Sequence, residues 1–246
     1  MKRRGAGILI CVFAMLSVTQ RAIAVTNDLF LQGLEEYRAG QFTGAAKSFR
    51  AEVERRPASG ALVNLGLTEW RRGRAGTAIL AWEQARWINP FDTQARANLA
   101  YARQLTGAES PDFSWYERAS TWLPANAWAW LVGGSLWLAI GLTVLPGVFR
   151  WPKSAWSQAI AALGLTLFLA SLPANYGVVT RTRIGFVLQK DAALRLTPTR
   201  EAEAVAKLAA GEPARELRKR GDYVLIRTTH GQGWVERNQF GRVCPE

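Results

Sequence analysis

The side chains that most often perform enzymatic chemistry are scarce in this sequence. It contains one histidine, His230, and two cysteines, Cys11 and Cys244. The segment Gly-Gln-Gly follows His230 and is typical of a turn, so we expect a solvated loop residue there rather than a catalytic base. No paired carboxylates, Cys/His pair or Ser/His/Asp set is evident, and no Cys/His cluster has the spacing of a zinc site. The sequence therefore predicts no catalytic residues, no metal site and no cofactor.

Composition points to binding and to a membrane. The 246 residues include 11 tryptophans and carry a formal net charge of +12. Tryptophan is concentrated in cores, at interfaces and in the belts where membrane proteins meet water. A positive chain attracts anionic lipid or an acidic partner. The basic residues are spread out and no nucleic-acid motif is present, so we expect no nucleic-acid binding.

Residues 1–24 have the pattern of a secretory signal peptide. Basic residues at positions 2–4 precede an uncharged stretch from Gly5 to Thr19, and Ala22-Ile23-Ala24 forms a small-residue cleavage site. Arg21, beside that site, leaves an uncleaved anchor as the alternative. In both cases the segment that follows is exported.

Two long uncharged segments predict a membrane hairpin. Residues 126–149 and 154–176 each exceed the ~20 apolar residues that a transmembrane helix needs. Trp128, Trp130 and Trp151 lie near the ends, as interfacial anchors do. The alternative is a pair of buried helices in a soluble protein.

The short joint between these segments fixes their topology. Only residues 150–153 connect them, so the two helices must run antiparallel. Arg150 and Lys153 place this turn in the cytoplasm by the positive-inside rule. The signal peptide agrees, and together they predict that residues 25–125 and 177–246 face the periplasm from the inner membrane of a bacterium.

A 33-residue self-similarity runs through residues 25–107. Identical or aromatic residues recur at that offset: Gly33/Gly66, Gly40/Gly73, Ala45/Ala78, Phe49/Trp82 and Pro57/Pro90. This pattern resembles the tetratricopeptide repeat (TPR), a hairpin of two helices. We expect repeats at about 26–58 and 59–91 and a capping helix over 92–106, begun by Asp92 or Thr93. The alternative is a chance similarity between two amphipathic helix pairs.

The predicted TPR helices suggest a binding face. The first helix of each TPR hairpin lines the concave surface, which typically holds a partner's peptide or helix. By position, the candidate partner-binding residues are Tyr37, Asn64, Trp70, Asn98 and Tyr101. The sequence departs from the repeat pattern at positions 36 and 69, where glutamate replaces the usual aromatic residue.

After the second apolar segment the pattern changes to short strands. We predict a linker over residues 108–125 and a small barrel over residues 177–246. The order Arg195–Pro198, Val205–Gly211, Tyr223–Ile226 and Gly231–Val235 resembles a bacterial SH3 domain. The basic residues 218–220 are interpreted as a solvated loop. Tyr223 and Trp234 are the candidate ligand-binding residues of this domain.

The complete order resembles the TPR/SH3 membrane proteins encoded in aerotolerance (Bat) operons. The segments Gly73–Arg86 and Asn89–Asp92, with Asn98-Leu99, are similar to the second repeat of that family. The resemblance implies partnership with von Willebrand factor A-type membrane proteins and, across the membrane, with a MoxR-type ATPase.

These observations predict a multi-domain membrane protein with an all-α TPR solenoid, a two-helix transmembrane hairpin and a small all-β SH3-like barrel. The expected function is that of a non-enzymatic scaffold for protein–protein interaction in the bacterial envelope. The alternative is a module that binds peptidoglycan of the cell wall through the SH3-like domain.

Overall fold

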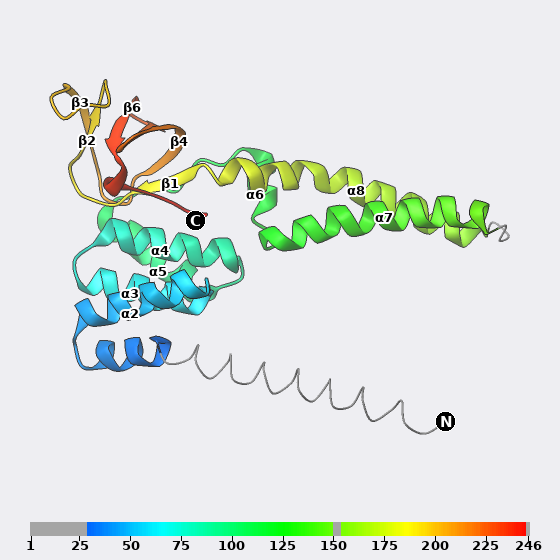
Figure 1. Cartoon of the computed structure of the whole chain (residues 1–246), viewed down its shortest axis with the longest axis horizontal. Helices are drawn as coiled ribbons and strands as arrows, with labels where there is room; N and C mark the ends of the chain where they lie inside the picture. Colours follow the sequence, from blue (N-terminus) through cyan, green and yellow to red (C-terminus); the bar gives the residue numbers. More distant parts are fainter. Residues whose placement is uncertain (1–28, 150–153, 245–246) are drawn as a thin grey trace.

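The computed structural model describes residues 29–149 and 154–244. Figure 1 shows a helical region and a β region lying together at one end of two long helices. The predicted combination of a helical region, two helices long enough to cross a membrane and a β domain is confirmed. The predicted signal peptide and the predicted turn at 150–153 lie outside the described residues.

The helical region consists of consecutive antiparallel helices joined by tight turns. The first covers residues 29–38, and the others are α2 (Phe42–Arg55), α3 (Ser59–Arg71), α4 (Ala75–Ile88) and α5 (Thr93–Thr106). Gly40 and Gly73 follow the first helix of each pair with φ of 73° and 74°, a left-handed conformation that glycine adopts without strain. Asp92 caps α5 by accepting the backbone N–H of Ala95 at 2.9 Å.

Glycines facing aromatic rings set the spacing of the helix pairs. A Cβ atom at Gly33 would lie 2.8 Å from the ring of Phe49, and one at Gly66 would overlap the indole of Trp82. Trp82 is buried, and its indole N–H donates to the carbonyl of Val63 at 3.2 Å. The rings therefore fill the space that the absent side chains leave.

The segment predicted to be a linker, residues 108–125, contains a packed helix. Helix α6 (Trp115–Ser120) begins with a capping box, in which the backbone N–H of Ser114 donates to the carboxylate of Glu117 at 2.9 Å. Glu117 and Ser120 are buried. A Ser-x-x-Glu pattern at 114–117 is the signal for this helix.

Helices α7 (Ala125–Val148) and α8 (Ala155–Arg181) lie side by side along much of their length (Figure 1). They cross closely where Gly164 meets the backbone at Ser135, 3.1 Å from the position of a Cβ. Helix α8 continues past the predicted end at residue 176. Its last turns pack on α6, with Gly177 against the backbone of Tyr116, so contact with protein extends the helix.

The β region is a single antiparallel sheet. Its strands are β1 (Ile184–Val187), β2 (Ala192–Arg195), β3 (Ala204–Leu208), β4 (Pro213–Arg220), β5 (Tyr223–Thr228), β6 (Gly231–Glu236) and β7 (Phe240–Arg242). Within the described residues from 184 to 242, the strand order is β3-β2-β6-β5-β4-β1-β7. Leu194, Val224, Ile226 and Val235 belong to its buried core.

One local interpretation of the β region was wrong, and one strand was not predicted. The basic run at 218–220 is the exposed end of β4, paired with β5, rather than a loop. Strand β7 was not predicted, because its three residues carry no alternating pattern; its pairing with β1 defines it. A bulge between Glu216 and Arg218 shifts the register of β4 against β5.

The helical and β regions share one hydrophobic core. Buried residues from both regions form a continuous cluster: Ala78, Ile79, Trp82, Leu99, Ala102, Ile184, Phe186 and Val243. A Cβ atom at Gly76 of α4 would lie 2.5 Å from the carbonyl oxygens of Val187 and Leu188. Only glycine allows the loop after β1 to lie this close to α4. The two regions therefore pack together as one unit.

Polar contacts reinforce this arrangement. Arg215 of β4 donates to both carboxylate oxygens of Glu117 at 2.7 and 2.6 Å. Arg181, at the end of α8, lies over the rings of Trp87 and Phe113, 5.0 and 5.4 Å from their centroids. It also donates to the hydroxyl of Ser120 at 3.1 Å. These contacts join α8 to the helical region and join α6, which packs on α8, to the β region.

Candidate interaction surfaces

Two of the residues predicted to bind a partner form an aromatic pair on the helical region. Trp70 of α3 and Tyr101 of α5 lie edge to face, with ring centroids 6.1 Å apart. Trp70 also lies 6.0 Å from the buried ring of Trp82, which fixes its orientation. Tyr101 is 57% exposed. The pair offers a rigid aromatic contact with one ring available to a partner.

The other predicted residues of this face have local contacts. Tyr37 packs edge to face against Phe42, with centroids 5.4 Å apart. The amide of Asn64 donates to the carbonyl of Gly60 at 2.8 Å, and Asn98 is half-buried. Trp70 and Tyr101 are therefore the two predicted residues that the structure brings into direct contact.

On the β region, the two predicted ligand-binding residues share the outer face of the sheet. Leu225 of β5 pairs directly with Trp234 of β6, so Tyr223, two residues before Leu225, lies diagonally from Trp234. Both aromatic residues are half-buried. Arg220 pairs with Tyr223 and Arg195 pairs with Trp234. The result is an aromatic patch bordered by arginines.

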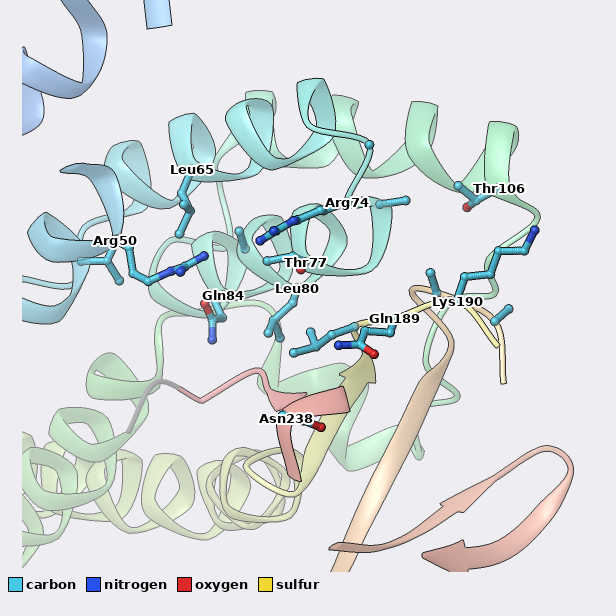
Figure 2. Close-up of a pocket in the computed structure, with 17 residues that line it drawn as sticks. Arg50, Leu65, Arg74, Thr77, Leu80, Gln84, Thr106, Gln189, Lys190 and Asn238 are labelled. Atoms are coloured by element: carbon cyan, nitrogen blue, oxygen red, sulfur yellow. The ribbon is translucent and has the colours of Figure 1, made fainter. Parts of the chain in front are cut away.

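A third surface, which sequence reasoning missed, is a cleft between the two regions. We call it the interdomain cleft; it encloses about 950 Å³. Figure 2 shows Arg50 and Arg74 extending into it from the helical region, with Gln189, Lys190 and Asn238 on the opposite side. The residues that line it are Arg50, Val53, Leu65, Gly73, Arg74, Ala75, Thr77, Leu80, Ala81, Gln84, Thr106, Leu188, Gln189, Lys190, Ala209, Ala210 and Asn238.

A buried carboxylate orders the basic side of this cleft. Glu69 has no exposed side-chain surface and accepts hydrogen bonds from Arg50 at 2.7 Å and from Arg72 at 2.9 and 3.1 Å. Arg74 lies 3.9 Å from the same carboxylate. Three guanidinium groups therefore surround one carboxylate, and positive charge exceeds negative charge by two.

The replacement of an aromatic residue by Glu69 was visible in the sequence. It could have indicated a buried ion pair in α3, because a buried carboxylate needs cationic partners. The second wall of the cleft could not have been found in this way. Its residues lie more than a hundred positions after the α4 residues that line the cleft. Only the packing of the shared core brings the two sets together.

The groups capable of acid–base or nucleophilic chemistry lie in separate places. His230 is exposed in the turn between β5 and β6, as expected, with Nε2 3.8 Å from a carboxylate oxygen of Glu212. Burial raises the pKa of the Cys244 thiol, and Arg242 lowers it by less. A raised pKa disfavours the reactive thiolate. Among the described residues, no cluster of His, Cys, Asp and Glu could hold a metal ion.

Comparisons of the chain with protein-family models, with curated proteins and with solved structures found no match. The chemistry of the three surfaces is therefore the basis for assigning a function.

Proposed function

We propose that the chain is a non-enzymatic scaffold, anchored in the bacterial inner membrane, that binds protein partners through its helical region. The observation that carries the proposal is the shared core at the root of the two long helices. Trp70 packs against this core, Tyr101 packs on Trp70, and Arg181 at the end of α8 lies over Trp87 of α4. A rigid aromatic surface on an anchored platform suits the assembly of other membrane proteins.

The composition and low burial of α7 and α8 support membrane anchoring. Each is long and apolar enough to cross a bilayer, and only 11% and 17% of their apolar windows are buried. A soluble core helix would be mostly buried, so this exposure favours a lipid environment. The contacts between the helical and β regions support placing both on one side of the membrane, and the signal-like residues 1–24 favour the periplasmic side.

The resemblance to the Bat family supports a more specific partner. We propose that the partners are von Willebrand factor A-type membrane proteins of a Bat/MoxR system. Such partners are themselves anchored in the membrane, so the two proteins meet within a plane. Modest contacts then suffice, because anchoring raises the effective concentration.

A site-specific cross-link tests this function in native membranes. The photoreactive residue p-benzoylphenylalanine replaces Tyr101, and the control places it at Lys47, an exposed residue of α2. We expect irradiation to capture von Willebrand factor A-type membrane proteins from position 101 only. Capture that is equal from both positions, or of lipid alone, would contradict the proposal.

The aromatic patch of the β region favours peptidoglycan binding as a second candidate function. Tyr223 and Trp234 lie on one face beside arginines that could pair with the carboxylates of wall peptides. The test is co-sedimentation of the purified protein with sacculi. Loss of sedimentation in Tyr223→Ala/Trp234→Ala, with Leu196→Ala as the exposed control, would support it. Equal sedimentation of both variants would exclude it.

A further inference from the structure

The interdomain cleft has the features of a binding site that is separate from the aromatic pair. Neither Trp70 nor Tyr101 lines it; its walls come from α2, α3 and α4 on one side and from loops of the β region on the other. Such a space between two packed regions is a common place for a ligand.

Positive charge is available on the helical wall. The side chain of Arg72 is 16% exposed, whereas those of Arg50 and Arg74 are 49% and 55% exposed. Glu69 offers one negative charge to all three. Arg50 donates one hydrogen bond to it, Arg72 donates two, and Arg74 lies 3.9 Å away. The cluster therefore keeps a net charge of +2, and its two more exposed members, Arg50 and Arg74, can pair with an incoming anion.

The opposite wall adds a cation and is held in place by backbone hydrogen bonds. Lys190 lies in the loop after β1 and lines the cleft. The N–H of Leu188 donates to the carbonyl of Gln239 at 2.8 Å, and the N–H of Gly211 donates to Val187 at 2.7 Å. These bonds fix the loop, so the wall is formed before any ligand arrives.

The rest of the lining suits a polypeptide. Leu65, Leu80 and Val53 supply apolar surface, and Gln189 and Asn238 supply side-chain amides that can pair with peptide groups. Among the described residues that line the cleft, none is aspartate or glutamate, and none is aromatic. The lack of aromatic rings disfavours a sugar strand or a nucleic acid, both of which stack on such rings.

We infer that the interdomain cleft binds an extended acidic segment of a partner protein. In this arrangement the carboxylates of the segment pair with Arg50, Arg74 and Lys190, while its aliphatic side chains contact Leu65 and Leu80. The net charge of +12 on the whole chain adds long-range attraction for an acidic partner. The inference rests on the proposed scaffold function and names the chemistry of what is held.

The experiment uses the full chain in native membranes, with p-benzoylphenylalanine in place of Gln189, an exposed residue of the cleft wall. Mass spectrometry identifies the captured peptide. We expect a protein segment in which aspartate and glutamate outnumber lysine and arginine. Capture should weaken as salt concentration rises, because salt screens partly exposed charges.

Charge variants decide whether the arginines hold that segment. Arg50→Gln/Arg74→Gln removes two positive charges from the cleft and leaves Arg72 on Glu69. We expect capture at position 189 to fall about tenfold or more. The control, Arg55→Gln/Arg71→Gln, removes the same charge from exposed positions outside the cleft and should leave capture unchanged. Far-ultraviolet circular dichroism checks that both variants fold.

Several results would overturn the inference. These are capture of wall fragments or lipid at position 189, capture of a segment without acidic excess, and equal capture by the two double variants. No capture at position 189 together with capture at Tyr101 would reject the cleft and leave the scaffold function standing. No capture at either position would reject both.

Discussion

Two apolar parts of the molecule differ in what covers their side chains. At the junction of the helical and β regions, Ile79, Trp82 and Phe186 are at most 1% exposed. In the long helices, Trp130 and Trp137 are 80% and 73% exposed. The junction completes its core within the chain, whereas the helices α7 and α8 leave their apolar surface for a surrounding medium. Apolar side chains of this chain are therefore covered in one part by the protein itself and left exposed in the other.

Polar groups follow the same division. In the long helices, the hydroxyls of Ser135, Thr143 and Thr166 donate to carbonyls of their own helix. A lipid environment requires this local satisfaction, because no water is available. At the junction, Glu117 and Arg215 pair across 98 positions of sequence. Long-range polar pairs of this kind lie at the junction, where the last residue of α8, Arg181, also donates to Ser120.

The largest expected effect is on the shared core. Phe186→Ala removes a fully buried ring of β1 and should lower the free energy of unfolding by about 3–5 kcal/mol. Unfolding of the full chain in detergent, followed by tryptophan fluorescence and circular dichroism, measures this. Val205→Ala, half-exposed on β3, is the control and should have little effect. If the unfolding transition of the β region moved to milder conditions while that of the helical region stayed unchanged, the two regions would not share a core.

The second prediction concerns the medium around the long helices. Leu169 lies near the middle of α8 and is 56% exposed. Leu169→Arg should oppose membrane insertion by about 2.5–3.5 kcal/mol, because it places a charge in hydrocarbon. Extraction of membranes with alkaline carbonate should release this variant. Leu196→Arg, 60% exposed in the β region, should stay in the membrane fraction. Equal release of the two would argue against spanning helices.

Sequence patterns predicted the parts that depend on neighbouring residues. The repeat of glycine, alanine and aromatic residues predicted the helix pairs, and two uncharged runs predicted α7 and α8. The same repeat pattern placed Trp70 and Tyr101 on the helices that the structure shows as α3 and α5. Tyr223 and Trp234 were named from the resemblance to a bacterial SH3 domain, and the register of β5 against β6 places them on one face of the sheet.

The parts that were not predicted depend on packing between distant segments. Nothing near Gly76 reveals that the carbonyls of Val187 and Leu188 lie against it. The interdomain cleft needs this contact, since it joins α4 to the loop after β1. The Ser114–Glu117 capping box was visible in the sequence, but the burial of Glu117 was not, because its partner Arg215 lies on a strand.

The third prediction separates close packing from helix propensity. Gly66→Ala adds a methyl group where the indole of Trp82 lies, and should lower the free energy of unfolding by about 2–3 kcal/mol. Gly60→Ala, in the same helix, meets no atom within 4 Å. It should raise stability by up to ~1 kcal/mol, because alanine favours helix. If Gly66→Ala raised the free energy of unfolding instead, the indole of Trp82 would not occupy the space beside residue 66.

The smallest effect tests the polar side of the junction. Glu117→Gln removes the charge that accepts two hydrogen bonds from Arg215, and should cost about 2 kcal/mol at neutral pH. Chemical unfolding measures this loss. Glu201→Gln changes an exposed carboxylate and is the matched control.

The dependence on pH identifies the charge as the cause. Burial raises the pKa of Glu117, but the hydrogen bonds from Arg215, from the backbone of Ser114 and from Thr180, together with the charge of Arg215, lower it by more, so its pKa lies below the ordinary value of 4.5. The folded state then holds this proton more weakly than the unfolded state. The contribution to stability is complete above the unfolded pKa and is lost as pH falls through the folded pKa. The stability difference between the native chain and Glu117→Gln should therefore shrink in acid. A difference that is the same in acid and at neutral pH would assign the effect to shape rather than to charge.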